Sequence, residues 1–297
     1  MIISVASGKG GTGKTTVATN LALSITDDVH PAGHDTSMGV QFLDCDVEEP
    51  NAHFFIKCDI ERTEKVSIPV PKVDISKCTF CGKCQEVCAY NAIAVIPQNK
   101  ERAAGGNVLV FPELCHGCGS CTYFCPKEAI KEVDREIGIM EKGNKDNLEF
   151  IHGKLNIGEA MAPPLIRAVK KQIKSGRTVI IDAPPGTSCP VIASIRDSDF
   201  CILVTEPTPF GLYDLTLAVD VLRKIKIPFG VVVNRSGLGD ESVDGFCKKE
   251  NIPILMKIPF SREIAAAYSK GNTIIDALPR YKDMFRDLFN TIKTRVK

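Results

Sequence analysis

Eight of the thirteen cysteines in this chain of 297 residues fall into two runs of the same spacing. Each run reads Cys-x-x-Cys-x-x-Cys-x-x-x-Cys, and closely spaced thiolates of this kind are typical of metal sites. Three cysteines at three-residue intervals can surround one iron–sulfur cubane, while the fourth points to the other cluster. The spacing therefore predicts crossed ligation of two [4Fe-4S] clusters, the first by Cys78, Cys81, Cys84 and Cys125, and the second by Cys115, Cys118, Cys121 and Cys88.

The two runs also share the residues that follow them, which indicates an internal duplication. Ala-Tyr-Asn-Ala-Ile follows Cys88, and Pro-Lys-Glu-Ala-Ile follows Cys125. The proline that is usual after the fourth cysteine is present at Pro126 but is replaced by Ala89 in the first run. Two Cys₄ zinc sites are the alternative, since zinc also binds Cys-x-x-Cys pairs. The remote fourth cysteine of each set favours the cubane.

A second motif with defined chemistry lies near the start of the chain, between a short apolar run and a helical pattern. Its glycines let the backbone curl around an anion, and N–H groups at the helix start point at phosphates. Lys14 would reach the β- and γ-phosphates of a nucleotide, and Thr15 would ligate Mg²⁺. The residues of this predicted phosphate loop are Gly8, Lys9, Gly10, Gly11, Thr12, Gly13, Lys14, Thr15 and Thr16.

Three aspartates end short apolar runs and are candidates for chemistry at the phosphates. Residues 40–43 lead into Asp44-Cys45-Asp46, and residues 178–181 lead into Asp182. Carboxylates at the carboxyl ends of parallel strands face the ligand crevice of a doubly wound sheet. An aspartate after an apolar strand suits a Mg²⁺ site, so we expect Asp182 to hold the ion. Two solvated turn carboxylates are the alternative for Asp44 and Asp46.

With Lys9, the loop resembles the deviant Walker A class of P-loop ATPases, which includes MinD, ParA, the Mrp-type iron–sulfur carriers and the nitrogenase iron protein. The resemblance implies ATP as the nucleotide and a homodimer that closes on ATP. In that dimer Lys9 would reach the partner's phosphates and offset charge that develops in phosphoryl transfer. The resemblance further implies that Asp46 orients the attacking water, and that Asp44 contacts the Mg²⁺ ion or supports its site.

Further site residues follow from the same resemblance. Asp-x-x-Pro-Gly, from Asp182 to Gly186, resembles the second switch of the family, in which Gly186 senses the γ-phosphate through its N–H. Asn234 lies where the family reads the adenine amino group, and Arg235 would stack on the base; a loop asparagine without a ligand is the alternative. Cys189 matches the offset of a cluster ligand in the nitrogenase iron protein, although burial as an apolar residue is the commoner outcome.

The elements that must position these residues form one interrupted pattern. Residues 1–60 and 149–297 predict a mostly parallel, doubly wound α/β ATPase domain in two parts. Residues 61–148 lack strong periodicity, and residues 74–134 resemble a bacterial two-cluster ferredoxin, so we expect an inserted α+β ferredoxin-like domain with short segments. Residues 27–39 read as a loop. The tail 281–297 predicts a helix that covers the sheet, with a membrane-surface anchor as the alternative.

Composition narrows the location and the partners. The net charge is +1, so no basic excess argues for nucleic acid. The phosphate loop lies too near the first residue for a signal peptide, and no apolar run is long enough to span a bilayer. These features favour a cytoplasmic protein without membrane contact, in which cysteines stay reduced and available to metals.

Together the motifs predict an ATPase that couples a nucleotide-switched dimer to electron transfer through two [4Fe-4S] clusters. The alternative is an iron–sulfur cluster assembly or carrier ATPase of the Mrp type. That subfamily holds its transferable cluster with a Cys-x-x-Cys pair near the C-terminus, and no such pair follows Cys189 here. A redox partner or a cluster-acceptor protein is expected in either case, and the sequence does not identify it.

Overall fold

The computed structural model describes residues 1–26, 39–98 and 105–296, and divides the chain into two compact units. The first unit comprises residues 1–64, 140–154 and 165–297, and the second comprises residues 65–139 and 155–164. The predicted loop at 27–39 lies, apart from its last residue, outside the described residues. The cysteine-rich stretch is thus an insertion between parts of the first unit.

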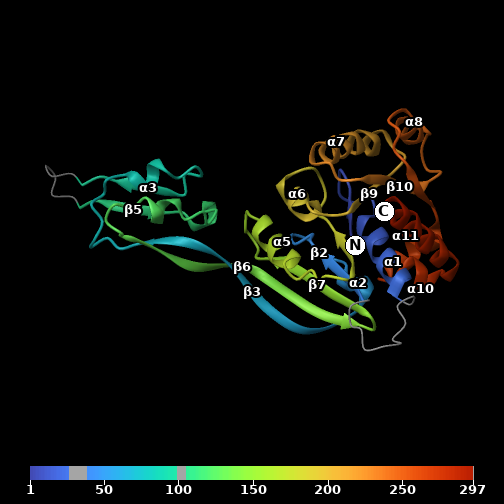
Figure 1. Cartoon of the computed structure of the whole chain (residues 1–297), viewed down its shortest axis with the longest axis horizontal. Coiled ribbons are helices and arrows are strands. Elements are labelled where there is room, and N and C mark those ends of the chain that lie inside the picture. Colours follow the sequence, from blue (N-terminus) through green and yellow to red (C-terminus); the bar gives the residue numbers. More distant parts are fainter. Residues whose placement is uncertain (27–38, 99–104, 297) are drawn as a thin grey trace. The chain divides into compact units, whose positions relative to one another are not determined.

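A nine-stranded sheet runs through the chain in the order β11-β10-β9-β1-β8-β2-β7-β6-β3. All the pairings from β11 to β7 are parallel (Figure 1). The prediction of a mostly parallel α/β sheet is therefore confirmed. The strands are β1 (Ile2–Ala6), β2 (Val40–Asp44), β3 (Asp59–Val73), β6 (Ile130–Lys145), β7 (Leu148–Leu155), β8 (Thr178–Asp182), β9 (Phe200–Thr205), β10 (Phe229–Ser236) and β11 (Ile254–Pro259).

Helices cover both faces of the parallel strands, which is why these strands read as continuous apolar runs. In β9, Ile202 and Val204 pack into one core, and Cys201 and Leu203 pack into the other. The first core includes residues of α1 (Lys14–Thr26), α2 (His53–Ile56), α10 (Ile274–Ala277) and α11 (Lys282–Arg295). The second core includes residues of α6 (Cys189–Ile195), α7 (Pro209–Ile225) and α8 (Ser242–Lys249).

The C-terminal tail forms α11, and its apolar face is buried. Phe285, Leu288 and Ile292 are each no more than 1% exposed and belong to the first core. The prediction that the tail covers the sheet is confirmed, because those side chains are not free to enter a membrane surface. Among the described residues, every helix is too short or too polar to cross a lipid bilayer.

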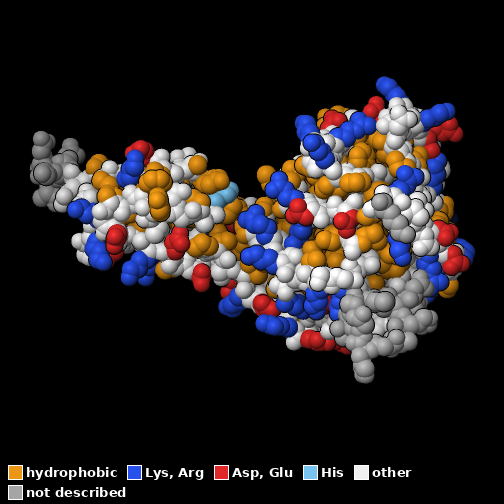
Figure 2. Space-filling view, in the orientation of Figure 1, with side chains coloured by type: hydrophobic (Ala, Val, Ile, Leu, Met, Phe, Trp, Pro, Cys, Tyr) orange, Lys and Arg blue, Asp and Glu red, His pale blue; other side chains and the backbone are white. Residues whose placement is uncertain are grey.

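The second unit carries the cysteines on short elements. Two of these elements are strands that pair antiparallel, β4 (Ile93–Ile96) and β5 (Asn107–Val110). The others are the single-turn helices α3 (Lys83–Glu86) and α4 (Ser120–Tyr123) and the 3-10 turn η2 (Pro112–Leu114). Hydrophobic and charged side chains alternate over the face of this unit seen in Figure 2.

The expectation of only short segments between residues 61 and 148 was wrong. β3 is 15 residues long and β6 is 16 residues long, and both continue from the first unit into the second. The first five residues of β3 are exposed, and apolar alternation is confined to residues 66–70, which is too short to predict a strand of this length. The compact units accordingly divide inside these strands, at residues 64/65 and 139/140.

Candidate functional site

The phosphate loop joins β1 to α1, and its backbone requires glycine at several positions. Gly11 and Gly13 have φ values of 80° and 95°, a region that side chains with a Cβ rarely adopt. A Cβ on Gly8 would lie 2.2 Å from the carbonyl oxygen of Asp214 in α7. The loop is therefore held by close packing against its own unit, with the α1 N-terminus open to an anion.

Asp182 ends β8 directly beside the first turn of α1. The hydroxyl of Thr15 donates to Asp182 Oδ2 at 2.6 Å. Asp182 Oδ1 is buried and has no hydrogen-bond partner among the described residues. Burial raises the pKa of Asp182 to about 6. A buried carboxylate oxygen without a partner, next to a hydroxyl, is a donor set that suits Mg²⁺.

Asp44 and Asp46 lie at the end of the neighbouring strand and have different surroundings. The pairing of β2 with β8 sets Asp44 beside Asp182. Asp44 is fully buried and accepts the N–H groups of Asp46 at 3.0 Å and Ala52 at 3.1 Å. Burial, reinforced by the charge of Asp182, raises its pKa well above the ordinary value. Both Asp44 oxygens thus hold the loop after β2, which fits the supporting role among its two predicted roles.

Lys14 forms an ion pair with Asp46 in this structure. Their Nζ and Oδ2 atoms are 3.5 Å apart, and both side chains are mostly buried. Burial raises the pKa of Asp46, and the ammonium group of Lys14 opposes that effect. A phosphate that reached Lys14 would therefore compete with Asp46 for its charge. The predicted phosphate-binding lysine and the predicted water-positioning aspartate are in direct contact.

A cavity of about 360 Å³ adjoins the phosphate loop within the first unit. Its polar wall includes Lys14, Thr15, Asp46 and Asn234. Its apolar wall comes from the end of β11 and from α9 (Arg262–Ser269), and contains Pro259, Phe260, Ile264, Ala265 and Tyr268. A flat base could lie against this apolar wall while its phosphates occupy the loop. The sequence signal for the wall was the Pro-Phe pair that follows the apolar run 254–258.

Asn234 uses both ends of its amide within the chain. Its Nδ2 donates to the carbonyl of Thr12 at 2.8 Å, and its Oδ1 accepts the N–H of Arg235 at 2.9 Å. Arg235 in turn pairs with Glu206 at 2.8 Å, and Lys9 lies 3.6 Å from the same carboxylate. The predicted adenine contacts of Asn234 and Arg235 stay predictions. Sequence reasoning missed Glu206, whose carboxylate Arg235 shares with Lys9, the lysine expected to act across a dimer.

In the second unit the eight motif cysteines divide between two cavities. Cys78, Cys81, Cys84 and Cys125 line the first cavity. Cys88, Cys115, Cys118 and Cys121 line the second cavity. These are the two sets that the sequence predicted, with one cysteine of each run exchanged. Within the described residues, no three of these thiols meet at one point where a single ion would sit.

The backbone around the two cavities repeats with the sequence. N–H groups of Phe80 and Gly117 donate to Cys78 Sγ and Cys115 Sγ, at 3.4 and 3.5 Å. The N–H groups of Ala92 and Ala129 donate to Cys88 Sγ and Cys125 Sγ, both at 3.3 Å. Amide donors to cysteine sulfur stabilise the charge of a bound cluster. Four thiols around each cavity, with amides aimed at them, therefore fit a cubane.

The remaining cysteines lie in the first unit, apart from the two cavities. Cys45, Cys201 and Cys247 are buried, and burial raises the pKa of Cys201 to about 12 and that of Cys247 to about 11. Cys58 is half-buried, whereas Cys189 is exposed at the start of α6. The buried thiols are inert packing residues. A cluster or redox role for Cys189 stays a prediction.

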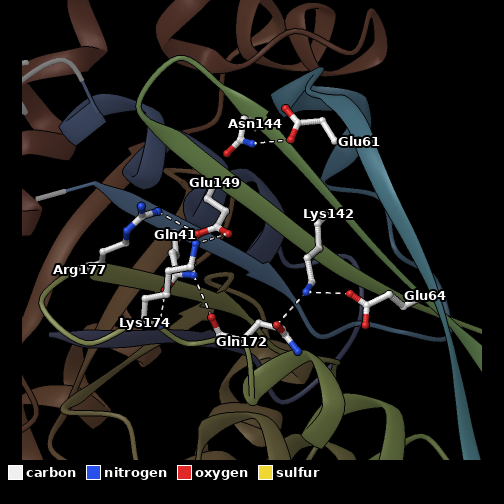
Figure 3. A network of polar contacts seen from close by, with 9 residues as sticks. All are labelled: Gln41, Glu61, Glu64, Lys142, Asn144, Glu149, Gln172, Lys174 and Arg177. Carbon is white, nitrogen blue, oxygen red and sulfur yellow. Dashed lines mark hydrogen bonds and ion pairs between the residues drawn. The ribbon is translucent and has the colours of Figure 1, made fainter. Parts of the chain in front are cut away.

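A polar network within the first unit ties the ends of β3 and β6 to the parallel strands (Figure 3). Gln41, fully buried in β2, donates from Nε2 to Glu149 Oε2 at 2.9 Å and to the Gln172 carbonyl at 3.0 Å. The side chain of Gln172 accepts Lys142 of β6 at 2.8 Å, and Lys142 pairs with Glu64 of β3 at 3.0 Å. The strands that lead to the insertion are thus anchored beside β2, whose last residue is Asp44.

Comparisons with known proteins agree with this arrangement of fold and loop. The chain is 30% identical over 287 residues to an uncharacterized protein of Methanocaldococcus jannaschii, across 96% of this chain and 93% of that one. It is 23% identical to an iron–sulfur cluster carrier protein of Pyrococcus horikoshii, across 98% and 86% of the two chains. It shares the fold of the septum site-determining protein MinD of Pyrococcus horikoshii, solved with Mg-ADP, with a TM-score of 0.57, 18% identity and coverage of 98% and 95%.

The match to a family model covers most of the chain. The model for the CobQ/CobB/MinD/ParA nucleotide binding domain matches residues 3–274, a span that contains the phosphate loop, the three aspartates and the insertion. The chain therefore belongs to the CobQ/CobB/MinD/ParA nucleotide-binding family.

Proposed function

We propose that this protein is an ATPase that holds two [4Fe-4S] clusters in its second unit, and that its nucleotide state governs what those clusters do. The observation that carries the proposal is the division of eight cysteines into two sets of four around two cavities. The same chain has a phosphate loop beside a buried carboxylate oxygen without a partner among the described residues. The first unit supplies the nucleotide site, and the second unit supplies the two cluster sites.

On the nucleotide side, the residues of the first unit take defined parts. The loop from Gly8 to Thr16 binds the phosphates, while Thr15 and Asp182 hold Mg²⁺. Arrival of the phosphates draws Lys14 away from Asp46, which leaves that carboxylate able to orient a water molecule. In the ATP-closed homodimer that we propose, Lys9 leaves Glu206 and meets the partner's phosphates. The N–H of Gly186 donates to the carbonyl of Ser7 at 2.9 Å in this structure, so Gly186 reports the γ-phosphate by exchanging that bond for one to the phosphate.

On the cluster side, the four thiolates of each cavity bind iron, and the amides of residues 80, 92, 117 and 129 stabilise the sulfur charge. When bound, each cluster would accept and release one electron at a time. The chain's own contribution is to fix the thiolates and to limit the access of water. Cys84 is buried and Cys121 is half-buried, and burial raises the pKa of both thiols.

Two uses of the clusters are compatible with this site. In the first, predicted from the ferredoxin spacing, the clusters stay in place and pass electrons to a partner. In the second, the protein assembles or delivers clusters. The comparisons favour the second use, because a protein named as an iron–sulfur cluster carrier aligns with 98% of the chain. The exposure of Cys81 and Cys118, one ligand in each cavity, also favours it, since an acceptor thiol could begin exchange there.

A transfer experiment separates the two uses. Protein reconstituted without oxygen is incubated with an apo-ferredoxin as acceptor, with ATP, without nucleotide, and as the Lys14→Ala variant with ATP. The two proteins are then separated and their iron and sulfide are measured. ATP-dependent gain of cluster by the acceptor supports delivery. Retention of both clusters, with reversible reduction by dithionite, supports electron transfer. A protein that contains neither iron nor sulfide contradicts both.

A further inference from the structure

The internal duplication allows the two cysteine cavities to be compared position by position. Alignment of the two runs pairs Phe80 with Gly117 and Gly82 with Gly119, and each member has a positive φ between 56° and 79°. Asn91 and Glu128, three residues after the fourth cysteine of each run, also match, with φ values of 53° and 48°. With the amide donors described above, the two halves therefore share one backbone. Differences between the cavities must come from side chains.

Three paired positions differ in charge. Lys83 lines the first cavity, where its counterpart in the second is Ser120. Lys127 lines the first cavity, where its counterpart is Tyr90. Val95 lines the first cavity, where its counterpart is Glu132. The first cavity thus has two lysines and no carboxylate in its lining, and the second has one carboxylate and neither lysine nor arginine.

Neighbouring ion pairs reduce these charges unequally. Lys83 pairs with Glu86 at 2.8 Å, so its charge is largely offset. Arg135 approaches the second set of cysteines, but Glu159 offsets its charge by accepting hydrogen bonds from both terminal guanidinium nitrogens. Among the described residues, Lys127 and Glu132 are the lining charges that have no ion-pair partner. Glu132 Oε1 would lie 3.0 Å from a Cβ on Gly119, which is next to the ligand Cys118.

The second cavity also has a pair of stacked rings in its lining. Tyr90 stacks on His116 with ring centroids 3.4 Å apart and planes 6° apart, and both residues line that cavity. Their counterparts in the first cavity are Lys127 and Thr79. Reduction of a cluster adds one negative charge, which a nearby cation stabilises and a nearby carboxylate opposes.

We propose that the two cluster sites are electrostatically unequal, and that Lys127 and Glu132 make the Cys78/Cys81/Cys84/Cys125 site the more easily reduced. This inference rests on the proposed function, and it holds whether the clusters are kept or delivered. One electron from a one-electron donor then resides at the first site, and the second site is reduced only at lower potential. Lys127 and Glu132 are positioning residues, since neither binds iron.

The test is a redox titration of the reconstituted full-length protein, followed by electron paramagnetic resonance. The variants are Lys127→Gln and Glu132→Gln; the matched controls are Lys131→Gln and Asp134→Asn, exposed residues that line neither cavity. All four positions are exposed, and equal iron and sulfide contents verify that each variant has assembled its clusters. We expect two reduction steps. Lys127→Gln lowers only the higher midpoint, Glu132→Gln raises only the lower midpoint, and the controls move neither.

Other results overturn the inference. A single reduction step that accounts for both clusters means that the two sites have the same midpoint potential. Shifts of the opposite sign, shifts on the other step, or no shift mean that these side chains do not set the order. Those outcomes leave the proposed function intact, because the clusters are present. Protein without iron and sulfide overturns the proposed function and this inference together.

Discussion

Three carboxyl groups, those of Asp44, Asp46 and Asp182, lie beside the phosphate loop, and among the described residues Lys14 is the one cation in ion-pair contact with them. Asp44 and Asp182 are both fully buried and adjacent in register, and Lys14 forms its ion pair with Asp46. Burial raises the pKa of all three carboxyl groups. Such a site is unfavourable when it is ionised and empty, and a divalent cation removes the penalty.

Replacement of Asp182 tests this charge balance through stability. The pKa of Asp182 rises from 3.8 to about 6, so its contribution to stability is present below pH 3.8 and is lost as the pH rises through 6. We expect the nucleotide-free Asp182→Asn variant to gain about 1–3 kcal/mol in unfolding free energy at pH 7. Denaturant unfolding between pH 4 and pH 7 measures it. The variant should also lose Mg²⁺-dependent ATP hydrolysis; equal stability at pH 7 would contradict the account.

Replacement of one remote cysteine tests the crossed ligation. Cys125 belongs to the second run but lines the cavity of Cys78, Cys81 and Cys84. We expect Cys125→Ser to impair that cluster and to spare the one near Cys115. Cys88→Ser is the matched variant and should do the reverse. Iron content and paramagnetic resonance spectra of each variant provide the measurement. Loss of the same cluster in both variants would contradict the crossed ligation.

At the scale of elements, the parallel strands and the strands of the insertion are joined by one buried amide. Gln41 of β2 accepts the Lys174 N–H at 2.8 Å and donates to Glu149, which also receives Lys174 Nζ and Arg177 at 2.8 Å (Figure 3). The side chain of Gln172 accepts a hydrogen bond from Lys142 of β6, and Lys142 pairs with Glu64 of β3. The base of the insertion is therefore fixed to the strand that positions Asp44.

Removal of the side-chain amide of Gln41 should lower the free energy of unfolding by more than the loss of one exposed hydrogen bond does. Gln41→Leu leaves the Lys174 N–H and the Gln172 carbonyl without their partner, so we expect a loss of about 1–3 kcal/mol in unfolding free energy. Asn144→Ala, which removes an exposed hydrogen bond to Glu61, is the control and should change stability by less than about 0.5 kcal/mol. Equal losses in chemical unfolding would show that the network does not anchor these strands.

Sequence patterns predicted the elements whose chemistry is local. The strand, the glycine-rich loop and α1 follow from residues 2–26, because positive φ at Gly11 and Gly13 and the buried strand leave a clear signature. β3 and β6 left a weaker signature, because charged residues interrupt both strands and apolar alternation covers only part of each. Glu206 was missed for a related reason: its contact with Lys9 joins residues distant in sequence.

At the scale of the whole molecule, one chain combines a nucleotide site and two cysteine cavities in separate compact units. The nucleotide cavity is lined only by residues of the first unit, and both cysteine cavities are lined only by residues of the second. Among the described residues, each cavity is therefore lined by its own unit alone. Assembly of one does not require the other to be filled.

Loss of the phosphate-binding lysine should therefore leave the clusters intact. We expect Lys14→Ala to abolish ATP binding, because the group that meets the β- and γ-phosphates is gone. Iron content and cluster absorbance should equal those of the unaltered protein. Calorimetric titration with ATP and iron analysis on the same sample give both values. Parallel loss of nucleotide binding and iron would mean that the two units do not assemble independently.

The measurement that tests the central claim most directly is the iron and acid-labile sulfide content of protein purified and reconstituted without oxygen. Two cubanes predict about eight iron and about eight sulfide per chain. They also predict loss of one whole cluster when any one of the cavity cysteines is replaced. Zinc in place of iron, or iron without sulfide, would contradict the assignment of the eight cysteines to two [4Fe-4S] clusters.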